Sequence, residues 1–121
     1  MTSNSAKTDV HHIHLHVKNV SEYKTIFEEV FGAQLFDHVI VGSKEILKFE
    51  LNGIRIFLSP AKGEFDEINH IGMMTDNIEQ QEKLLKDKGF EVVEKGITDK
   101  ENIVFLKSTG GLTLEFLQSL S

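Results

Sequence analysis

One pattern of hydrophobic and polar residues occurs twice along this chain of 121 residues. The segment HIHLHVKNVSEYKTIFEEVFGAQLF, from His12, aligns with HIGMMTDNIEQQEKLLKDKGFEVV, from His70, at an offset of 58 residues (70 − 12). The offset decreases by one after the helical segments and then returns to 58, where Leu58 aligns with Phe116. Few residues are identical, but the hydrophobic positions coincide. Such an internal repeat indicates a duplicated structural unit.

Each copy contains the same order of expected elements. A strand over residues 12–17 or 70–75 precedes an asparagine that can begin a helix and an amphipathic segment that a glycine ends. Three short strand segments follow, and in the first copy an Asn52-Gly53 pair predicts a hairpin between the last two. The predicted fold class is therefore α+β, with two βαβββ modules forming a cupped, mostly antiparallel sheet and the helices outside.

The repeat also sets the expected boundaries along the chain. We expect a disordered tail over residues 1–8, a first βαβββ module over 9–60, a linker over 61–69 and a second βαβββ module over 70–118. Because 121 residues match the usual size of one compact unit, both modules are expected to form one domain over 9–118.

The charge and composition exclude several classes of partner. The chain has 13 basic and 19 acidic residues, a formal charge of −6, whereas nucleic acids and anionic membranes select positive surfaces. No segment approaches the roughly 18 consecutive apolar residues of a membrane span. The first residues, MTSNSAKTD, lack the apolar run of a secretory signal, and cysteine is absent. We therefore expect a cytoplasmic protein with no nucleic-acid or membrane partner.

Four of the six histidines lie in the segment VHHIHLHV, residues 10–17. Alternate side chains of a strand share a face at a spacing of roughly 7 Å, so His12, His14 and His16 should point one way and His11 the other. If His12 lines a binding face, the next two histidines do as well. His16 is expected to be a hydrogen-bonded interior histidine, and the simpler interpretation of His12 is a solvated histidine at a strand edge.

Paired βαβββ units that open with histidine and close on a glutamate strand resemble the vicinal oxygen chelate superfamily. Its members include glyoxalase I, methylmalonyl-CoA epimerase, extradiol dioxygenases and bleomycin-resistance proteins. The segments HHIHLHVKNV and INHIGMMTDNI look like its opening strands. The segment NIVFLKSTGGLTLEFLQ is similar to the end of methylmalonyl-CoA epimerases, where a Lys-Ser-x-Gly-Gly turn precedes the glutamate. The resemblance covers residues 9 to 118.

The resemblance implies that His12, His70 and Glu115 are ligands of a divalent metal ion. Two imidazoles and one carboxylate, with positions left open, also form a facial triad that suits Fe, Mn, Co, Ni or Zn. A lone carboxylate in the apolar strand LTLEFLQ is costly unless it is paired or bound to a metal, although an outward-facing Glu115 is the alternative. The fourth ligand of the family, Glu or Gln, falls at position 57 (115 − 58), where this chain has Phe57. His14 would either replace that ligand or contact the substrate.

The resemblance also implies a catalytic base and a substrate-binding turn. Glu45 follows the VGSK turn as the base follows its glycine turn in the epimerases, with Glu50 as competitor and an exposed strand glutamate as the simpler interpretation of both. Lys107 and Ser108 of the KSTGG turn are expected to bind a carboxylate, amide or phosphate with the backbone amides, unless the turn is a plain hairpin. Phe57 would contribute an apolar surface to the pocket.

The leading functional hypothesis is a metal-dependent isomerase or lyase, most like methylmalonyl-CoA epimerase or a glyoxalase. Such an enzyme abstracts a proton next to a metal-polarised carbonyl of a small molecule, with an acyl-CoA thioester as the candidate substrate. One alternative is an extradiol-type dioxygenase that uses a two-His, one-Glu iron site. The other is a metal-free binding protein of the bleomycin-resistance type. By analogy with the superfamily we expect a homodimer, and the site then lies either within one chain or across two.

Overall fold

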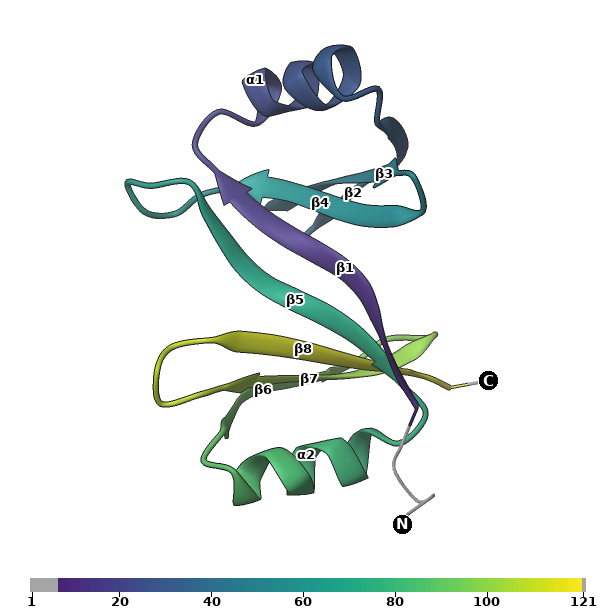
Figure 1. Cartoon of the computed structure of the whole chain (residues 1–121), viewed down its shortest axis with the longest axis vertical. Helices are drawn as coiled ribbons and strands as arrows, with labels where there is room; N and C mark the ends of the chain where they lie inside the picture. The colour runs from purple at the N-terminus through teal and green to yellow at the C-terminus, as the bar shows by residue number, and fades with distance from the viewer. Residues whose placement is uncertain (1–6, 121) are drawn as a thin grey trace. The chain divides into compact units, whose positions relative to one another are not determined.

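The computed structural model describes residues 7–120, which form two compact units (Figure 1). We call the unit over His12–Asn69 the first module, and the unit that joins the segment before His12 to the segment from His70 onward the second module. Most of the expected tail over residues 1–8 falls outside the described residues. The backbone N–H of Lys7 donates to Asp76 Oδ1 at 3.0 Å. No helix within residues 7–120 is long and apolar enough to cross a membrane.

The first module contains the expected βαβββ order, with the strands in the spatial order β2-β3-β4-β1. Strand β1 is parallel to β4, and the other two pairs are antiparallel. Its elements are β1 (Thr8–Val17), which begins before the module boundary, α1 (Val20–Thr25), the π-helical turn η1 (Ile26–Val30), β2 (Gln34–Val41), β3 (Lys44–Leu51) and β4 (Ile54–Pro60).

The second module repeats this arrangement in the order β5-β8-β7-β6, with β5 parallel to β8 and the other pairs antiparallel. Its elements are β5 (Glu67–Thr75), α2 (Ile78–Asp87), β6 (Glu91–Ile97), β7 (Glu101–Lys107) and β8 (Thr113–Ser119). Strand β5 begins within the segment expected to be a linker. The α+β class with two βαβββ modules is therefore confirmed, and its strand pairs are mostly antiparallel.

Short polar signals begin the helices and turn the hairpin as the sequence predicts. Asn19 Oδ1 accepts from the backbone N–H of Glu22 at 3.0 Å, and Asn77 Oδ1 accepts from that of Gln80 at 3.1 Å. Between β3 and β4, Asn52 and Gly53 have φ values of 52° and 85°. Positive φ at both central residues defines a type I′ turn, whose twist matches that of the two strands.

The register of the strand pairs repeats between the modules. His14 lies opposite Phe57 in the pair β1–β4, and Gly72 lies opposite Glu115 in the pair β5–β8. Both partners move by 58 residues (72 − 14 and 115 − 57), so Phe57 and Glu115 occupy equivalent positions. A shift of register occurs at Leu35/Asp37 in β2 and again at Val92/Glu94 in β6, which places the change of offset at a repeated β-bulge.

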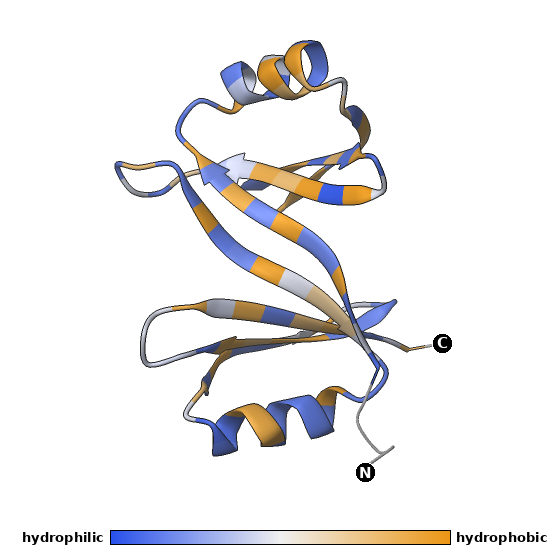
Figure 2. Ribbon diagram, in the orientation of Figure 1, coloured by the Kyte–Doolittle hydropathy of each residue, from blue (hydrophilic) through white to orange (hydrophobic). Residues whose placement is uncertain are grey.

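Strand alternation gives each module an apolar face beneath its helix and a second face that carries polar groups. In the first module Leu47, Phe49 and Leu58 form a core with Phe27 of η1. We call the other face the histidine face, and Figure 2 shows the alternation along β1. It carries His12, His14, His16, Phe57 and Ser59.

The second module has the equivalent two faces. Leu106, Leu114 and Phe116 form its core with Val104, and apolar side chains of α2 pack against them. We call the opposite face the Glu115 face. It carries His70, Phe105 and Glu115, because these residues alternate with the core residues along their strands.

Candidate metal centre and substrate site

His12 is held on the histidine face by stacking. Its side chain is 4% exposed, and its ring lies almost parallel to the ring of Phe57, with 4.2 Å between the centroids and 13° between the planes. Offset stacking at such a separation is favourable for aromatic rings. The phenyl ring at position 57 therefore cannot bind a metal, but it fixes the plane of the neighbouring imidazole.

His14 lies beside His12 and is anchored by a hydroxyl group. Its Nε2 is 2.7 Å from Oγ of Ser59, a residue of β4 that is fully buried. The ring-nitrogen ligand atoms of His12 and His14 come within 4.8 Å of each other. The ring of His16 packs edge-on against His14 at 5.1 Å, and its residue is also buried. The three alternate histidines thus share one face of β1, as their spacing predicts.

The second module carries a buried imidazole–carboxylate pair. His70 Nε2 lies 3.1 Å from Glu115 Oε1, and the two residues are 4% and 8% exposed. Phe105, the register partner of Glu115, packs edge-on against His70 at 5.2 Å. Strand β8 provides the carboxylate, and β5 provides the imidazole from its centre.

The geometry of this pair fits metal binding. Ligand atoms about 2.1 Å from one ion and at right angles to each other lie about 3 Å apart. The separation of 3.1 Å between His70 and Glu115 matches that value, and it also matches a direct hydrogen bond. Imidazole and carboxylate donors suit Zn, Fe, Mn, Co and Ni. The donor set of the described residues therefore fits a divalent metal ion.

Equivalent positions of the two modules carry different side chains. The pair His12 and Phe57 in the first module corresponds to His70 and Glu115 in the second, since both members shift by 58 residues (70 − 12 and 115 − 57). Stacking in one module thus stands where a polar contact stands in the other. Gly72, opposite Glu115, adds no side chain to that rung of the ladder.

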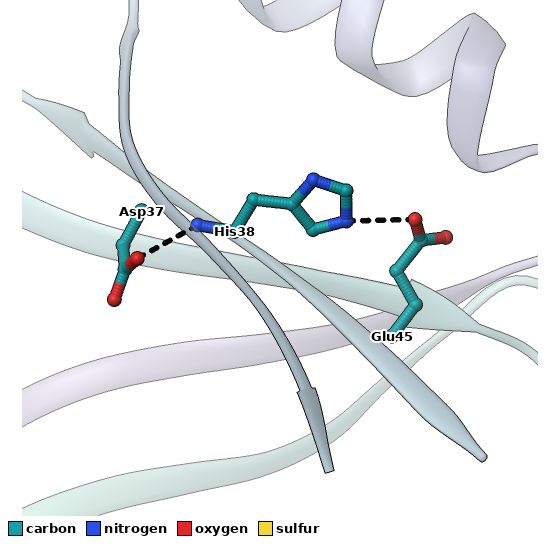
Figure 3. Close-up of polar contacts among 3 residues, drawn as sticks. All are labelled: Asp37, His38 and Glu45. Atoms are coloured by element: carbon teal, nitrogen blue, oxygen red, sulfur yellow. Dashed lines mark hydrogen bonds and ion pairs between the residues drawn. The ribbon is translucent and has the colours of Figure 1, made fainter. Parts of the chain in front are cut away.

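Glu45 does not lie with the histidines. It alternates along β3 with Leu47, so it belongs to the helix-covered face, where its carboxylate pairs with His38 Nε2 at 2.8 Å (Figure 3). The backbone N–H of His38 donates to Asp37 Oδ1 at 2.9 Å. Glu50 lies on the same strand at the opposite parity and is exposed, so it shares the histidine face.

The KSTGG segment forms a closed turn at the end of β7. The backbone N–H of Ser108 donates to the carbonyl of Leu112 at 2.9 Å, and Ser108 Oγ accepts from the N–H of Leu112 at 3.0 Å. The Ser108 hydroxyl therefore stabilises the turn, as the plain-hairpin interpretation requires. Lys107 is exposed and alternates with Phe105, so it belongs to the Glu115 face.

Two residues of the histidine face are absent from the sequence-based candidates. Ser59 contacts His14, and Lys48 places its Nζ 5.2 Å from the centroid of the Phe57 ring and 3.9 Å from Asp37 Oδ2. Alternation along β4 would have placed Ser59 on the face of Phe57, and pairing of β3 with β4 places Lys48 opposite Phe57. The signal was therefore the predicted strand pairing rather than any motif.

Comparison with models of known protein families gives no match, and neither does comparison with curated protein sequences. Solved structures do match. Methylmalonyl-CoA epimerase from Mycobacterium tuberculosis has a TM-score of 0.80 at 13% identity, covering 100% of this chain and 94% of that one. A hypothetical protein from Bacillus halodurans C-125 has a TM-score of 0.78 at 18% identity, covering 95% and 96%.

A third solved structure carries a ligand name. Methylmalonyl-CoA epimerase from Streptomyces coelicolor, in complex with 2-nitronate-propionyl-CoA, has a TM-score of 0.71 at 16% identity and covers 97% of this chain and 100% of that one. These similarities, at low identity over almost the whole chain, show a shared fold. The chain has the glyoxalase-like fold of vicinal oxygen chelate proteins, and the predicted resemblance is confirmed at that level.

Proposed function

We propose that this protein is a metal-dependent enzyme that abstracts a proton next to the thioester carbonyl of an acyl-CoA. The observation that carries the proposal is the buried pair of His70 and Glu115, on the repeated strand position of a fold shared with methylmalonyl-CoA epimerases. Taking two ionisable groups out of water is costly, and a bound divalent ion would compensate both. A pair maintained solely for stability has no such need of an imidazole.

His12, His70 and Glu115 are the proposed metal ligands. His12 is buried and held by Phe57, and the other two are buried and in contact, so each side chain is already oriented within its own module. Such orientation reduces the conformational entropy lost when a ligand binds. When bound, a divalent metal supplies Lewis-acid stabilisation of the negative charge that develops on the carbonyl oxygen.

Glu50 is the proposed catalytic base. Proton abstraction requires a carboxylate on the face that carries the ligands, and Glu50 meets that condition within the first module, whereas Glu45 is paired with His38 on the other face. In the reaction the C–H bond next to the thioester breaks, the proton passes to the carboxylate, and the electron pair moves toward the carbonyl oxygen. Return of a proton to the same carbon completes an epimerisation.

Polar groups on the Glu115 face would bind the rest of the substrate. Lys107 offers an exposed ammonium group to a carboxylate or phosphate, and the turn that Ser108 stabilises holds it at the end of β7. On the histidine face, Phe57 and His14 would contact the acyl group. The Streptomyces coelicolor epimerase binds a propionyl-CoA analogue, which supports a CoA thioester as the substrate class.

Hydrogen–deuterium exchange tests the proposal directly. The purified protein, loaded in turn with Co²⁺, Mn²⁺, Ni²⁺ and Zn²⁺, is incubated with methylmalonyl-CoA in heavy water, and deuterium at the acidic carbon is measured by mass spectrometry. Exchange should occur with at least one metal. Glu50→Gln should lower the rate on the order of a hundred- to ten-thousand-fold while metal content stays unchanged.

Other results would point elsewhere. Loss of exchange in Glu45→Gln, with Glu50→Gln active, would move the base to Glu45. If no loaded form exchanges deuterium, the epimerase-like activity is wrong. Tightly bound iron with oxygen-dependent ring cleavage of a catechol would then identify a dioxygenase, whereas a protein that binds no metal at all would fit a binding protein.

A further inference from the structure

We propose that His14 is a further metal ligand, which replaces the side chain that Phe57 cannot provide, and that Ser59 determines which of its ring nitrogens binds. This inference rests on the proposed function, because it completes the same metal site. It concerns residues of the first module only. Its starting point is the rung of the ladder at which His14 and Phe57 face each other.

The equivalent rungs of the two modules each contain one donor side chain, on opposite strands. In the second module the donor is Glu115 on β8, and its partner Gly72 on β5 has no side chain. In the first module the β4 residue is Phe57, and its partner on β1 is His14. Directly paired residues of neighbouring strands lie about 5 Å apart and point the same way. A side chain from position 14 therefore reaches the region that a ligand at position 57 would occupy.

The packing around Phe57 directs both imidazoles rather than separating them. The phenyl ring lies flat against His12 and edge-on to His14, with a centroid distance of 5.9 Å and 79° between the planes for the second contact. The ligand nitrogens of His12 and His14 come within 4.8 Å of each other. Two nitrogens on opposite sides of one ion lie about 4.2 Å apart, so small rotations of the side chains suffice for both to bind it.

Ser59 supplies the outer contact that a metal-binding histidine requires. Such histidines donate the N–H of their second nitrogen to an oxygen acceptor, which fixes the tautomer and the ring orientation. Here Nε2 of His14 lies 2.7 Å from Ser59 Oγ inside the protein, so Nε2–H donates to the hydroxyl. That arrangement assigns the lone pair to Nδ1, and Nδ1 is the nitrogen proposed to bind the metal. Ser59 is thus a positioning residue.

A Co²⁺ titration tests the ligand. Metal affinity is measured by competition with a chromogenic chelator, and coordination by the visible absorption spectrum of bound Co²⁺. His14→Ala and His14→Gln should weaken binding by more than the roughly 10- to 100-fold that loss of an outer partner costs, and should change the spectrum. The glutamine variant retains a group that can contact Ser59. The matched control is His11→Ala, which removes the neighbouring histidine from the other face of β1.

Transfer of the donor to the facing strand is the sharper test. In the double variant His14→Ala/Phe57→Glu, a carboxylate enters at the position equivalent to Glu115. Affinity should recover at least tenfold relative to His14→Ala. A histidine that merely fills space would give no such recovery, because the substitution at Phe57 would then remove packing against His12 and restore nothing.

Ser59 is tested through rescue. Ser59→Ala should weaken Co²⁺ binding by about 10- to 100-fold, and Ser59→Thr, which keeps a hydroxyl, should restore most of it. If wild-type protein binds Co²⁺ and both single variants of His14 bind it equally well, His14 is not a ligand and the inference is wrong, while the proposed function stands. If the wild-type protein binds no divalent metal, or if His70→Ala binds it fully, the proposed metal site itself is wrong.

Discussion

At the scale of single residues, the pair His70–Glu115 and the stack of His12 on Phe57 are two uses of one structural position. The ladders that hold them have the same register, yet one position ends in a carboxylate and the other in a phenyl ring. A carboxylate can bind a metal, whereas a phenyl ring can only orient its neighbour. Duplication followed by divergence of one residue therefore leaves the two modules with unequal shares of the proposed chemistry.

The first residue-scale prediction concerns the proposed ligands. His12→Ala, His70→Ala and Glu115→Ala should each lower the divalent-metal content of the purified protein sharply, because each removes one of three donors. Metal content is measured by elemental analysis after dialysis, with circular dichroism to verify the fold. His38→Ala is the matched control, since His38 pairs with Glu45 on the helix-covered face. Undiminished metal content in the Glu115→Ala protein would remove that residue from the site.

The sequence predicts some of these residues and misses others for a physical reason. Alignment of the repeat identifies Phe57 as the counterpart of Glu115, because a strand ladder preserves residue offsets as long as no bulge intervenes. Ser59 gives no such signal, since a serine in a strand is ordinary and acquires its role only through the facing strand. The face of Glu45 was equally hidden, because its parity depends on where β3 begins after the turn.

At the scale of elements, the connection between the two copies is attached to the first helix. Asp66 accepts hydrogen bonds from the Tyr23 hydroxyl at 2.6 Å and from the backbone N–H of Lys18 at 2.8 Å. The hydrogen bond to Asp66 raises the pKa of Tyr23 above its ordinary value, and the same bond lowers the pKa of Asp66. The connecting segment is therefore tied to the beginning of α1 by one carboxylate.

A titration of the single tyrosine tests this attachment. The chain has one tyrosine and no tryptophan, so absorbance of the phenolate reports Tyr23 alone. Ionisation of the phenol removes the proton that it donates and places a negative charge beside Asp66, so wild-type Tyr23 should ionise at higher pH than Tyr23 of Asp66→Ala. Glu64→Ala, a change in the same segment, should leave the titration where it is in the wild type. Coincident curves for wild type and Asp66→Ala would show that the contact does not persist in solution.

The linkage between this contact and stability has a definite sign. Because the folded-state pKa of Asp66 is lowered, its contribution is present above the pKa of the unfolded carboxyl and is lost as pH falls through the folded value. The Tyr23 phenol has a raised pKa, so its contribution is present at neutral pH and is lost as pH rises through the folded value. Both contributions therefore operate together near neutrality.

Elements were more predictable than their local details. All the expected strands form, since alternation and turn residues act over a few neighbours. The segment expected as one helix up to Gly32 instead changes at Ile26 into the π-helical turn η1, in which the N–H of Phe31 donates to the carbonyl of Ile26 at 3.2 Å. The wider turn brings Phe27 into the core with Phe49, and that packing depends on the sheet rather than on the helix sequence.

At the scale of the whole molecule, the internal repeat predicts the fold class, since each copy specifies one βαβββ module with its own core. The homodimer remains a prediction. Exposed apolar side chains on terminal strands, such as Ile40 on β2 and Ile97 on β6, are 70% and 71% exposed and suit contact with a second chain, but they are not a contact. The activity depends on both modules, because the proposed ligands come from each.

A metal bound by residues of both modules should make their stabilities depend on each other. A ligand that binds only the folded state stabilises it by about 2.7 kcal/mol when its concentration is a hundred times the dissociation constant. Tyr23 fluorescence reports the first module alone, because the chain contains no other tyrosine and no tryptophan. Saturating Co²⁺ or Zn²⁺ should therefore raise the urea midpoint detected by Tyr23.

The decisive comparison is His70→Ala, a substitution in the second module that lies far along the chain from Tyr23. If the metal requires ligands from both modules, this variant should lose the metal-induced increase in the urea midpoint seen by Tyr23. Far-ultraviolet circular dichroism, which detects both modules, should lose the same increase. An undiminished increase in the His70→Ala protein would mean that the histidines of β1 bind the ion without the second module. The duplicated strand position of Glu115 would then have another purpose.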